Sequence, residues 1–139
     1  MDKVKEITCL VIGAIGSAFS SVFGGFDFTL GLLIFLMATD YITGIVVAYK
    51  GKSKKTNSGK LSSNIGFKGL AKKFLILVYV MIAVQLDKTM KIDYIRDMVV
   101  ISYSCNEVIS IAENIGLSGV TLPKWIEKGL EILLGRDEK

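Results

Sequence analysis

An apolar run followed directly by a lysine-rich segment constrains this chain more than any other feature. The run covers residues 28–49, FTLGLLIFLMATDYITGIVVAY, and Asp40 is its one charged residue. Residues 50–73 follow with eight lysines and no acidic residue. A helix needs about 20 apolar residues to cross the hydrocarbon core of a bilayer, and short lysine-rich loops stay on the cytoplasmic side. The stretch therefore predicts an all-α integral membrane protein and indicates its orientation.

Three further runs are expected to join this helix in one membrane domain that covers residues 1–139. Between two lysines and Asp87, the third run has only thirteen uncharged residues, so a helix lying on the membrane surface is the alternative there. Three or four helices are therefore expected to span. The expected spans are residues 7–26, 28–49, 70–86 and 98–117, with a basic cytoplasmic loop at 50–69.

Lysines indicate how the chain is oriented. The N-terminal segment and residues 50–73 hold ten of the 17 basic residues, whereas the connections on the opposite side hold three. The basic side of a membrane protein is the cytoplasmic side. With four spans, both termini and the lysine-rich loop share that side, and we expect them there. Lys72 and Lys73 are expected to extend to the interface as anchors of the third run. The first run is expected to be retained rather than cleaved as a signal peptide, because it leads straight into another span.

Small residues recur every fourth position along the first run. Such spacing lets helix backbones approach closely in lipid. The pattern is equally compatible with packing inside one chain and with contacts between copies. The residues expected at these contacts are Gly13, Gly16, Ser17, Ser20, Ser21 and Gly24.

Polar side chains also occur inside the expected spans. A charge there costs about 3 kcal/mol on insertion scales, so Asp40 must face protein or water, and we expect a structural role for it. The fourth run carries a polar stripe about 120° wide. This stripe must face helices of the same chain, other copies or water, and Asp40 and Lys73 are available partners within the chain. The stripe consists of Asn106, Glu107, Ser110, Glu113 and Asn114.

Residues 123–134 are expected to form a last, amphipathic helix that lies in the membrane interface. Pro123 stands at the first helical position, where proline is tolerated best. The helix is too short and too charged to span. Trp125 is expected to anchor it at the level of the lipid headgroups.

The sequence lacks the residues of several kinds of chemistry. It has no histidine and no phosphate-binding loop, zinc-protease, serine-hydrolase or C-x-x-C motif. We therefore expect that the protein is not an enzyme and binds no cofactor or metal ion. Cys9 and Cys105 are expected to be small buried side chains. The net charge of +4 comes from lysines beside apolar spans, which favours contact with anionic lipid over nucleic acid.

Two blocks of residues carry a family resemblance. The first is DYITG at 40–44 with the lysine-rich linker behind it, and the second runs from Asn106-Glu107 to Leu122-Pro123-Lys124. Over about residues 33–134 the chain resembles the phage-lysis and toxin-secretion holin family of Gram-positive bacteria and their phages. Val108 and Thr121 depart from the pattern, where glycine and proline are usual. These two departures leave undecided whether the chain bends at these positions as it does in the family, and they do not affect the resemblance itself.

The resemblance implies a homo-oligomer in the bacterial cytoplasmic membrane that opens lesions. It implies an endolysin or a large toxin as the released cargo, and an antiholin as a regulatory partner. Two other interpretations remain open. One is a small four-helix transporter, and the other is an antiholin or membrane scaffold that forms no pore itself.

Overall fold

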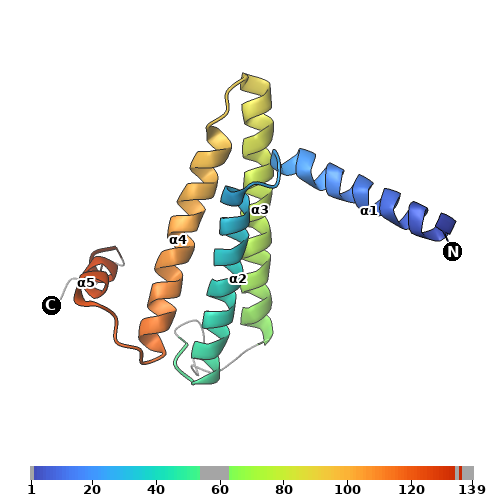
Figure 1. The fold of residues 1–139 in the computed structure, drawn as a ribbon. Helices are drawn as coiled ribbons and strands as arrows, with labels where there is room; N and C mark the ends of the chain where they lie inside the picture. Colours follow the sequence, from blue (N-terminus) through green and yellow to red (C-terminus); the bar gives the residue numbers. More distant parts are fainter. Residues whose placement is uncertain (1, 54–62, 134, 136–139) are drawn as a thin grey trace.

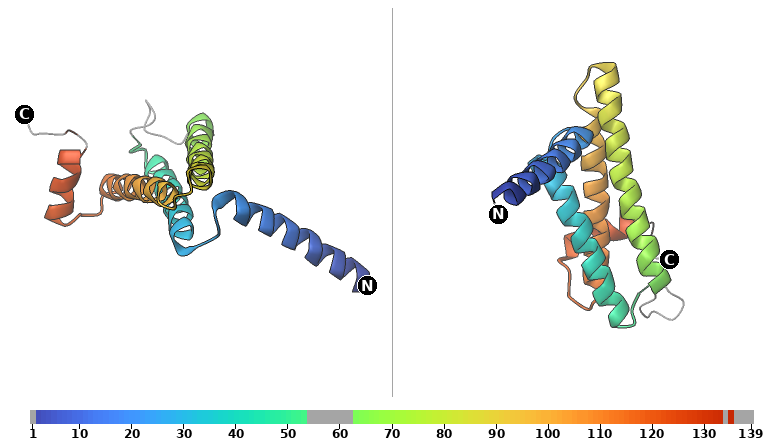
Figure 2. Two further views of the ribbon diagram at one scale, coloured as in Figure 1. Left: turned by 90° about the horizontal axis from the view of Figure 1, so that it is seen from above. Right: turned by 90° about the vertical axis from the view of Figure 1, so that its right-hand side faces the viewer.

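The computed structural model describes residues 2–53, 63–133 and 135, and the regular structure of this part is entirely α-helical. Helices α2, α3 and α4 lie side by side as an antiparallel bundle, whereas α1 and α5 project away from it (Figures 1 and 2). The all-α fold predicted from sequence is confirmed. The helices are α1 (Asp2–Phe23), α2 (Phe28–Tyr49), α3 (Ser63–Met90), α4 (Ile95–Leu117) and α5 (Lys124–Leu133).

The bundle has two different ends. We call the end that holds the α1–α2 and α3–α4 connections the Arg96 end, and the end where α2 leads into residues 50–53 the lysine-loop end. By length and composition, α1, α2 and α3 are long and apolar enough to cross a membrane. The chain is therefore a membrane protein. Helix α4 is 23 residues long but carries the polar stripe.

Helix boundaries agree with the expected ones for α2 and differ for α1, α3, the start of α4 and both ends of α5. Helix α3 covers 28 residues, roughly 42 Å at 1.5 Å per residue, rather than residues 70–86. Residues 63–69, expected in the basic loop, are thus helical, and residues 54–62 of that loop lie outside the described part. Helix α3 ends where Lys91 adopts a φ of 56° and the Ile92 N–H donates to the Asp87 carbonyl at 3.0 Å, a helix-terminating arrangement.

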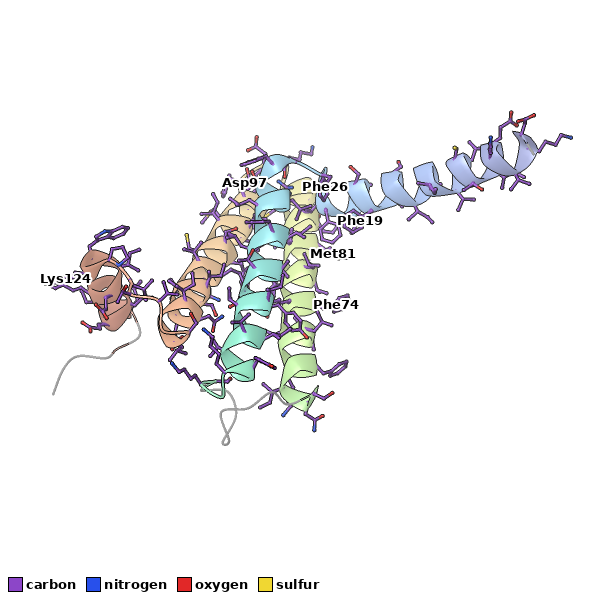
Figure 3. All side chains as sticks on the ribbon, turned by 60° about the horizontal axis from the view of Figure 1, so that its bottom comes forward. Phe19, Phe26, Phe74, Met81, Asp97 and Lys124 are labelled. Carbon is purple, nitrogen blue, oxygen red and sulfur yellow. The ribbon has the colours of Figure 1, made fainter. Side chains whose placement is uncertain are left out.

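Apolar side chains of α2, α3 and α4 fill the half of the bundle nearest the Arg96 end. Leu30, Leu33, Val80 and Val100 are completely buried there. Other large apolar side chains face outward, such as Phe19, Phe26 and Phe74 (Figure 3). Such faces suit contact with lipid and are unusual on a water-soluble monomer. The buried cluster consists of Phe23, Leu30, Leu33, Met37, Ile76, Val80 and Val100.

Candidate functional site

A polar cavity of about 260 Å³ lies among α2, α3 and α4, between the centre of the bundle and the lysine-loop end. We call it the chamber. It is large enough for several water molecules. Its walls combine apolar side chains such as Ile45, Ile65 and Leu117 with a set of polar ones. The polar lining includes Asp40, Ser53, Lys72, Lys73, Asn106, Glu107, Ser110, Glu113 and Asn114.

Lys73 joins three helices at the inner end of the chamber. Its Nζ, on α3, donates to Asp40 Oδ2 of α2 at 2.8 Å and to Glu107 Oε2 of α4. The three side chains are 11%, 10% and 5% exposed, respectively. We call this contact the Lys73 bridge. Removing one partner of such a buried ionic contact typically costs about 3–5 kcal/mol, because an uncompensated charge stays behind.

Asn114 connects α4 to the same carboxylate. Its Nδ2 donates to Asp40 Oδ1 at 3.0 Å and to Thr43 Oγ1 at 3.1 Å, and the Thr43 hydroxyl donates to the Asp40 carbonyl at 3.0 Å. The helices approach closely at this level, since a Cβ added to Gly44 would lie 3.7 Å from Asn114 Nδ2. Asp40 therefore has partners on both neighbouring helices, although it lies in the middle of an apolar run.

The residues of the predicted stripe lie along the chamber in different settings. Glu107 and Asn114 are buried within the bundle, Ser110 and Glu113 are half-buried, and Asn106 is exposed. The stripe thus faces the other helices of the same chain and the cavity between them. Packing against helices of the same chain is one of the three environments that the sequence left open.

Lys73 is not at the interface where the sequence reasoning placed it. Its ammonium group lies inside the bundle, whereas the neighbouring Lys72 is exposed. Consecutive residues of a helix point about 100° apart, so only one of two adjacent lysines can face the helix partners. The hydrophobic pattern does not indicate which of the two does so.

The small residues of α1 do not pack within the described part of the chain. A Cβ added to Gly13 or Gly16 would meet no atom within 4 Å, and Ser17 and Ser21 are exposed. Ser20 is half-buried, and its carbonyl accepts from the Gly25 N–H at 2.7 Å at the end of the helix. Most of this surface therefore has no partner helix in the described part of the chain.

Gly24 lies outside the ridge to which the sequence assigned it. Helix α1 ends at Phe23, and Gly24 follows with a φ of 73°, a conformation that glycine adopts readily. A Cβ there would lie 3.3 Å from both Arg96 Cδ and Val84 Cγ2. Gly24 therefore serves the turn between α1 and α2 rather than a helix surface.

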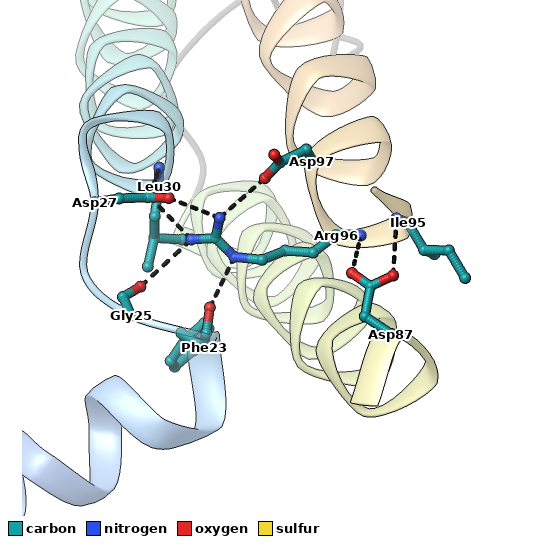
Figure 4. A network of polar contacts seen from close by, with 8 residues as sticks. All are labelled: Phe23, Gly25, Asp27, Leu30, Asp87, Ile95, Arg96 and Asp97. Carbon is teal, nitrogen blue, oxygen red and sulfur yellow. Dashed lines mark hydrogen bonds and ion pairs between the residues drawn. The ribbon is translucent and has the colours of Figure 1, made fainter. Parts of the chain in front are cut away.

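Arg96 is the main residue that the sequence reasoning missed. It is 8% exposed and holds the α1–α2 connection (Figure 4). Its Nε donates to the Phe23 carbonyl at 2.8 Å, and its Nη2 donates to the Gly25 carbonyl at 3.3 Å. The guanidinium also binds both carboxylate oxygens of Asp27, at 2.8 and 2.9 Å. We call these contacts the Arg96 clamp.

Two aspartates complete the Arg96 end. Asp27 is the N-cap of α2 and accepts from the Leu30 N–H at 2.9 Å. The hydrogen bonds from Arg96 lower the pKa of Asp27 to about 2. Asp87 of α3 accepts from the first two N–H groups of α4, those of Ile95 and Arg96, at 3.0 and 2.9 Å. A carboxylate at a helix N-terminus is favourable because the N–H groups there lack helical partners.

At the other end of α4, the exposed helix α5 begins at Lys124, directly after Pro123. The Pro123 carbonyl accepts from the Ile126 and Glu127 N–H groups, so proline stands one position before the helix. Trp125 is 76% exposed, and Figure 3 shows the helix standing off the bundle. The exposed face of α5 thus carries a large aromatic side chain that nothing in the described part of the chain covers.

Both cysteines differ from expectation. Cys9 and Cys105 are free and exposed, because they lie on outward faces of α1 and α4 rather than in the buried cluster. Among residues 2–53, 63–133 and 135, no group of three or more His, Cys, Asp or Glu side chains could hold a metal ion.

Comparison with known proteins gives one consistent picture. The chain matches the bacteriophage holin family over residues 17–135. It is 34% identical over 131 residues to an uncharacterized protein of Clostridium perfringens, covering 91% of this chain and 92% of that one. It is 36% identical over 143 residues to an uncharacterized protein of Listeria monocytogenes, covering 100% and 95%. A probable holin of Bacillus phage phi105 is 30% identical over 105 residues, covering 75% and 73%. No solved structure matches the chain significantly.

Proposed function

Because this chain belongs to the bacteriophage holin family, we propose that it acts as a holin. It oligomerises in the bacterial cytoplasmic membrane and opens lesions that release an endolysin or a large toxin. The relative in phage phi105 described as a probable holin supports this assignment. The protein carries out no catalytic step of its own, needs no cofactor and binds no nucleic acid.

The observation that carries the proposal is the polar face of α4 inside a bundle of membrane-length helices. Glu107 and Asn114 are buried against α2 and α3 in the single chain. Lipid cannot accept such a face, because unsatisfied polar groups are costly in hydrocarbon. Water can accept it, so the same residues can line an aqueous lesion when copies assemble.

Helix α1 is the surface through which copies meet. Its small residues Gly13, Gly16, Ser17 and Ser21 are uncovered in the single chain, and small residues support close helix packing in lipid. A homo-oligomer formed through α1 leaves the α2–α4 bundle intact until the lesion opens. An antiholin would bind the same surface.

Both termini and the lysine loop lie in the cytoplasm, because most lysines occur on that side. Single cysteines at Lys52 and Asp93 test this orientation in a background without Cys9 and Cys105. A membrane-impermeant thiol reagent added to intact cells is expected to label position 93 and not position 52. The reverse result contradicts the orientation.

Production of the chain alone in a bacterium, followed with a potential-sensitive dye, tests the function. We expect an abrupt loss of membrane potential, and lysis when an endolysin is produced with it. An unrelated three-helix membrane protein at equal abundance is the control. Tolerance to a toxic cation without depolarisation identifies a transporter instead. Delay of a related holin's lysis, without depolarisation by the chain itself, identifies an antiholin.

A further inference from the structure

We infer that an apolar groove between the end of α1 and the outward face of α3 binds a phospholipid, with an acyl chain in the groove and the phosphate at Lys88. Such binding requires that the chain lies in a membrane and does not require lesion formation. In the proposed orientation, the Arg96 end faces outward and the lipid belongs to the outer leaflet.

The groove lies where the last turn of α1 meets α3, and its volume is about 340 Å³. Val22 of α1 forms one side of it. Val78 and Ile82 of α3 form the other side, together with Met81, which is labelled in Figure 3. Ile82 is 50% exposed, so the groove is open to the surrounding lipid. One turn of a helix, about 10 Å across and 5.4 Å long, occupies roughly 400 Å³. The groove can therefore take in a hydrocarbon chain but not a helix.

Polar groups follow the apolar lining in order along α3. Gln85 and Thr89 line the outer part of the same groove. Gln85 is exposed, and its side-chain amide makes no hydrogen bond in the described part of the chain. Lys88 follows Gln85 by three residues, or roughly 4.5 Å along the helix axis, and the polar region on each side of a bilayer is roughly 5–8 Å thick. The order of apolar, amide and ammonium groups therefore matches the acyl chain, ester and phosphate of a phospholipid.

The Lys88 ammonium is held beside the groove by α1. Its Nζ donates to the Ser21 carbonyl at 2.9 Å, and Ser21 directly precedes Val22, which lines the groove. An ammonium group has three N–H donors, so two remain for an anion. Lys88 is exposed, and an anion can reach it from the outer side of the membrane.

The carboxylates at the Arg96 end are directed to other partners. Asp87 accepts from N–H groups of α4, and Asp27 binds Arg96. In residues 2–53, 63–133 and 135, no carboxylate forms an ion pair with Lys88. A phosphate complements this charge with a short, charge-assisted hydrogen bond. The small and apolar side chains of a second copy's α1 would instead leave Lys88 and the Gln85 amide without an acceptor.

Titration of the detergent-solubilised full chain with phosphatidylglycerol, followed by native mass spectrometry, measures the binding. Diacylglycerol with the same acyl chains is the matched ligand that lacks the phosphate. We expect one phosphatidylglycerol to bind per chain in a saturable manner. Its apparent affinity should exceed that of diacylglycerol about tenfold or more, because the phosphate adds a charge-assisted hydrogen bond.

Two substitutions test the two parts of the site separately. Lys88→Gln should weaken phosphatidylglycerol binding about tenfold and leave diacylglycerol binding unchanged, and Lys88→Arg should restore it. Ile82→Trp fills the groove and should weaken the binding of both lipids. Lys91→Gln, in the connection to α4, is the control for charge. Leu75→Trp adds the same ring at an exposed position of α3 outside the groove and is the control for size.

A phosphatidylglycerol that carries a photoreactive diazirine in its acyl chain locates the site in nanodiscs. Crosslinks mapped by peptide mass spectrometry are expected to concentrate on Val22 and residues 78–86. Their yield at these positions should fall in Ile82→Trp and stay unchanged in Leu75→Trp.

Three results would overturn the lipid site. The first is an even spread of crosslinks over the outward faces of α2 and α3, which is ordinary bilayer contact. The second is equal weakening by Lys88→Gln and Lys91→Gln, which is general attraction to surface charge. The third is a photoreactive side chain at Leu86 that crosslinks another copy instead of lipid, which assigns the groove to assembly.

If Lys88→Gln does not fold, the comparison of the two lipids on the wild type and on Ile82→Trp still decides the result. Saturable binding at the groove in a chain that causes no depolarisation would reject the proposed function and leave the lipid site standing.

Discussion

Arg96 and Asp27 are 69 positions apart in the chain, yet the guanidinium of one binds both carboxylate oxygens of the other, at 2.8 and 2.9 Å. Asp27 at the same time caps α2. One pair of residues therefore joins the start of α2 to the start of α4 and fixes where α1 ends. This planar, two-point contact is specific to arginine, because the ammonium of lysine lacks the fork.

Arg96→Lys keeps the charge and loses this fork. We expect a lower melting temperature of the detergent-solubilised protein and less protein in the membrane. Arg96→Met should be worse, by about 1–3 kcal/mol, since it also leaves the Phe23 and Gly25 carbonyls without their donor. Lys128→Met on the exposed α5 is the control. Equal melting temperatures for all three variants would contradict a stabilising role for the clamp.

The pKa of Asp27 predicts a narrow acid window. Hydrogen bonding from Arg96 lowers this pKa from 3.8 to about 2. A carboxyl whose pKa is lower in the folded state contributes stability above its unfolded pKa, and that contribution is lost as pH falls through the folded value. The effect is small because the Asp27 side chain is 47% exposed. We compare the melting temperatures of the wild type and of Asp27→Asn. Their difference should shrink as the pH falls from about 4, near the unfolded pKa, to about 2, near the folded pKa. A constant difference over that window would contradict the assignment.

Leucine at Gly13 and Gly16 should weaken contacts between copies, because larger side chains hold helix backbones apart. We expect weaker crosslinked oligomers and later lysis, with unchanged abundance, since nothing lies within 4 Å of either position in the single chain. Ala14→Leu on the same helix is the control. Crosslinking that stays at the wild-type level would exclude this surface from assembly.

Gly24 should respond differently from the other small residues. Gly24→Ala places a Cβ in a left-handed backbone conformation, which costs about 1–2 kcal/mol, and brings it 3.3 Å from Arg96 Cδ. We expect a lower melting temperature and lower abundance rather than a selective loss of crosslinking. A normal melting temperature with weaker crosslinking would return Gly24 to the helix surface predicted from sequence.

Trp125 is the single tryptophan of the chain, so its fluorescence reports on α5 alone. An aromatic side chain at headgroup level should show blue-shifted emission and quenching by lipids brominated near the headgroups. Lipids brominated deep in the acyl chains should quench it less. Emission typical of water in proteoliposomes would show that α5 does not lie on the membrane.

Periodicity and charge spacing in the sequence predicted helix α2 and the polar face of α4, but they did not predict the full length of α3. The run at 28–49 has a single charge, so α2 was predictable to the residue. Glu107 and Asn114 lie two helical turns apart, which places them on one face without further information. Hydrophobicity underestimated α3, because Lys68 and Lys72 lie on exposed parts of a helix that continues through them.

Tertiary contacts account for what the sequence did not reveal. Lys72 and Lys73 are adjacent residues of the same type, and only the positions of Asp40 and Glu107 in the folded chain show which one is buried. In the sequence, Arg96 is an ordinary polar residue at the start of a helix. Its role depends on the Phe23 and Gly25 carbonyls, which only the fold brings next to it. A glycine at a helix end and a glycine on a helix face are also indistinguishable by spacing alone.

The Arg96 clamp has a geometric consequence for any assembly. Because it binds the carbonyls on both sides of Gly24, it sets the direction in which α1 leaves the bundle. If copies join through α1, that direction fixes the angle between successive subunits. The curvature of the resulting ring, and hence the diameter of the hole it can enclose, would then be encoded by one arginine at the far end of the molecule from the lysine loop.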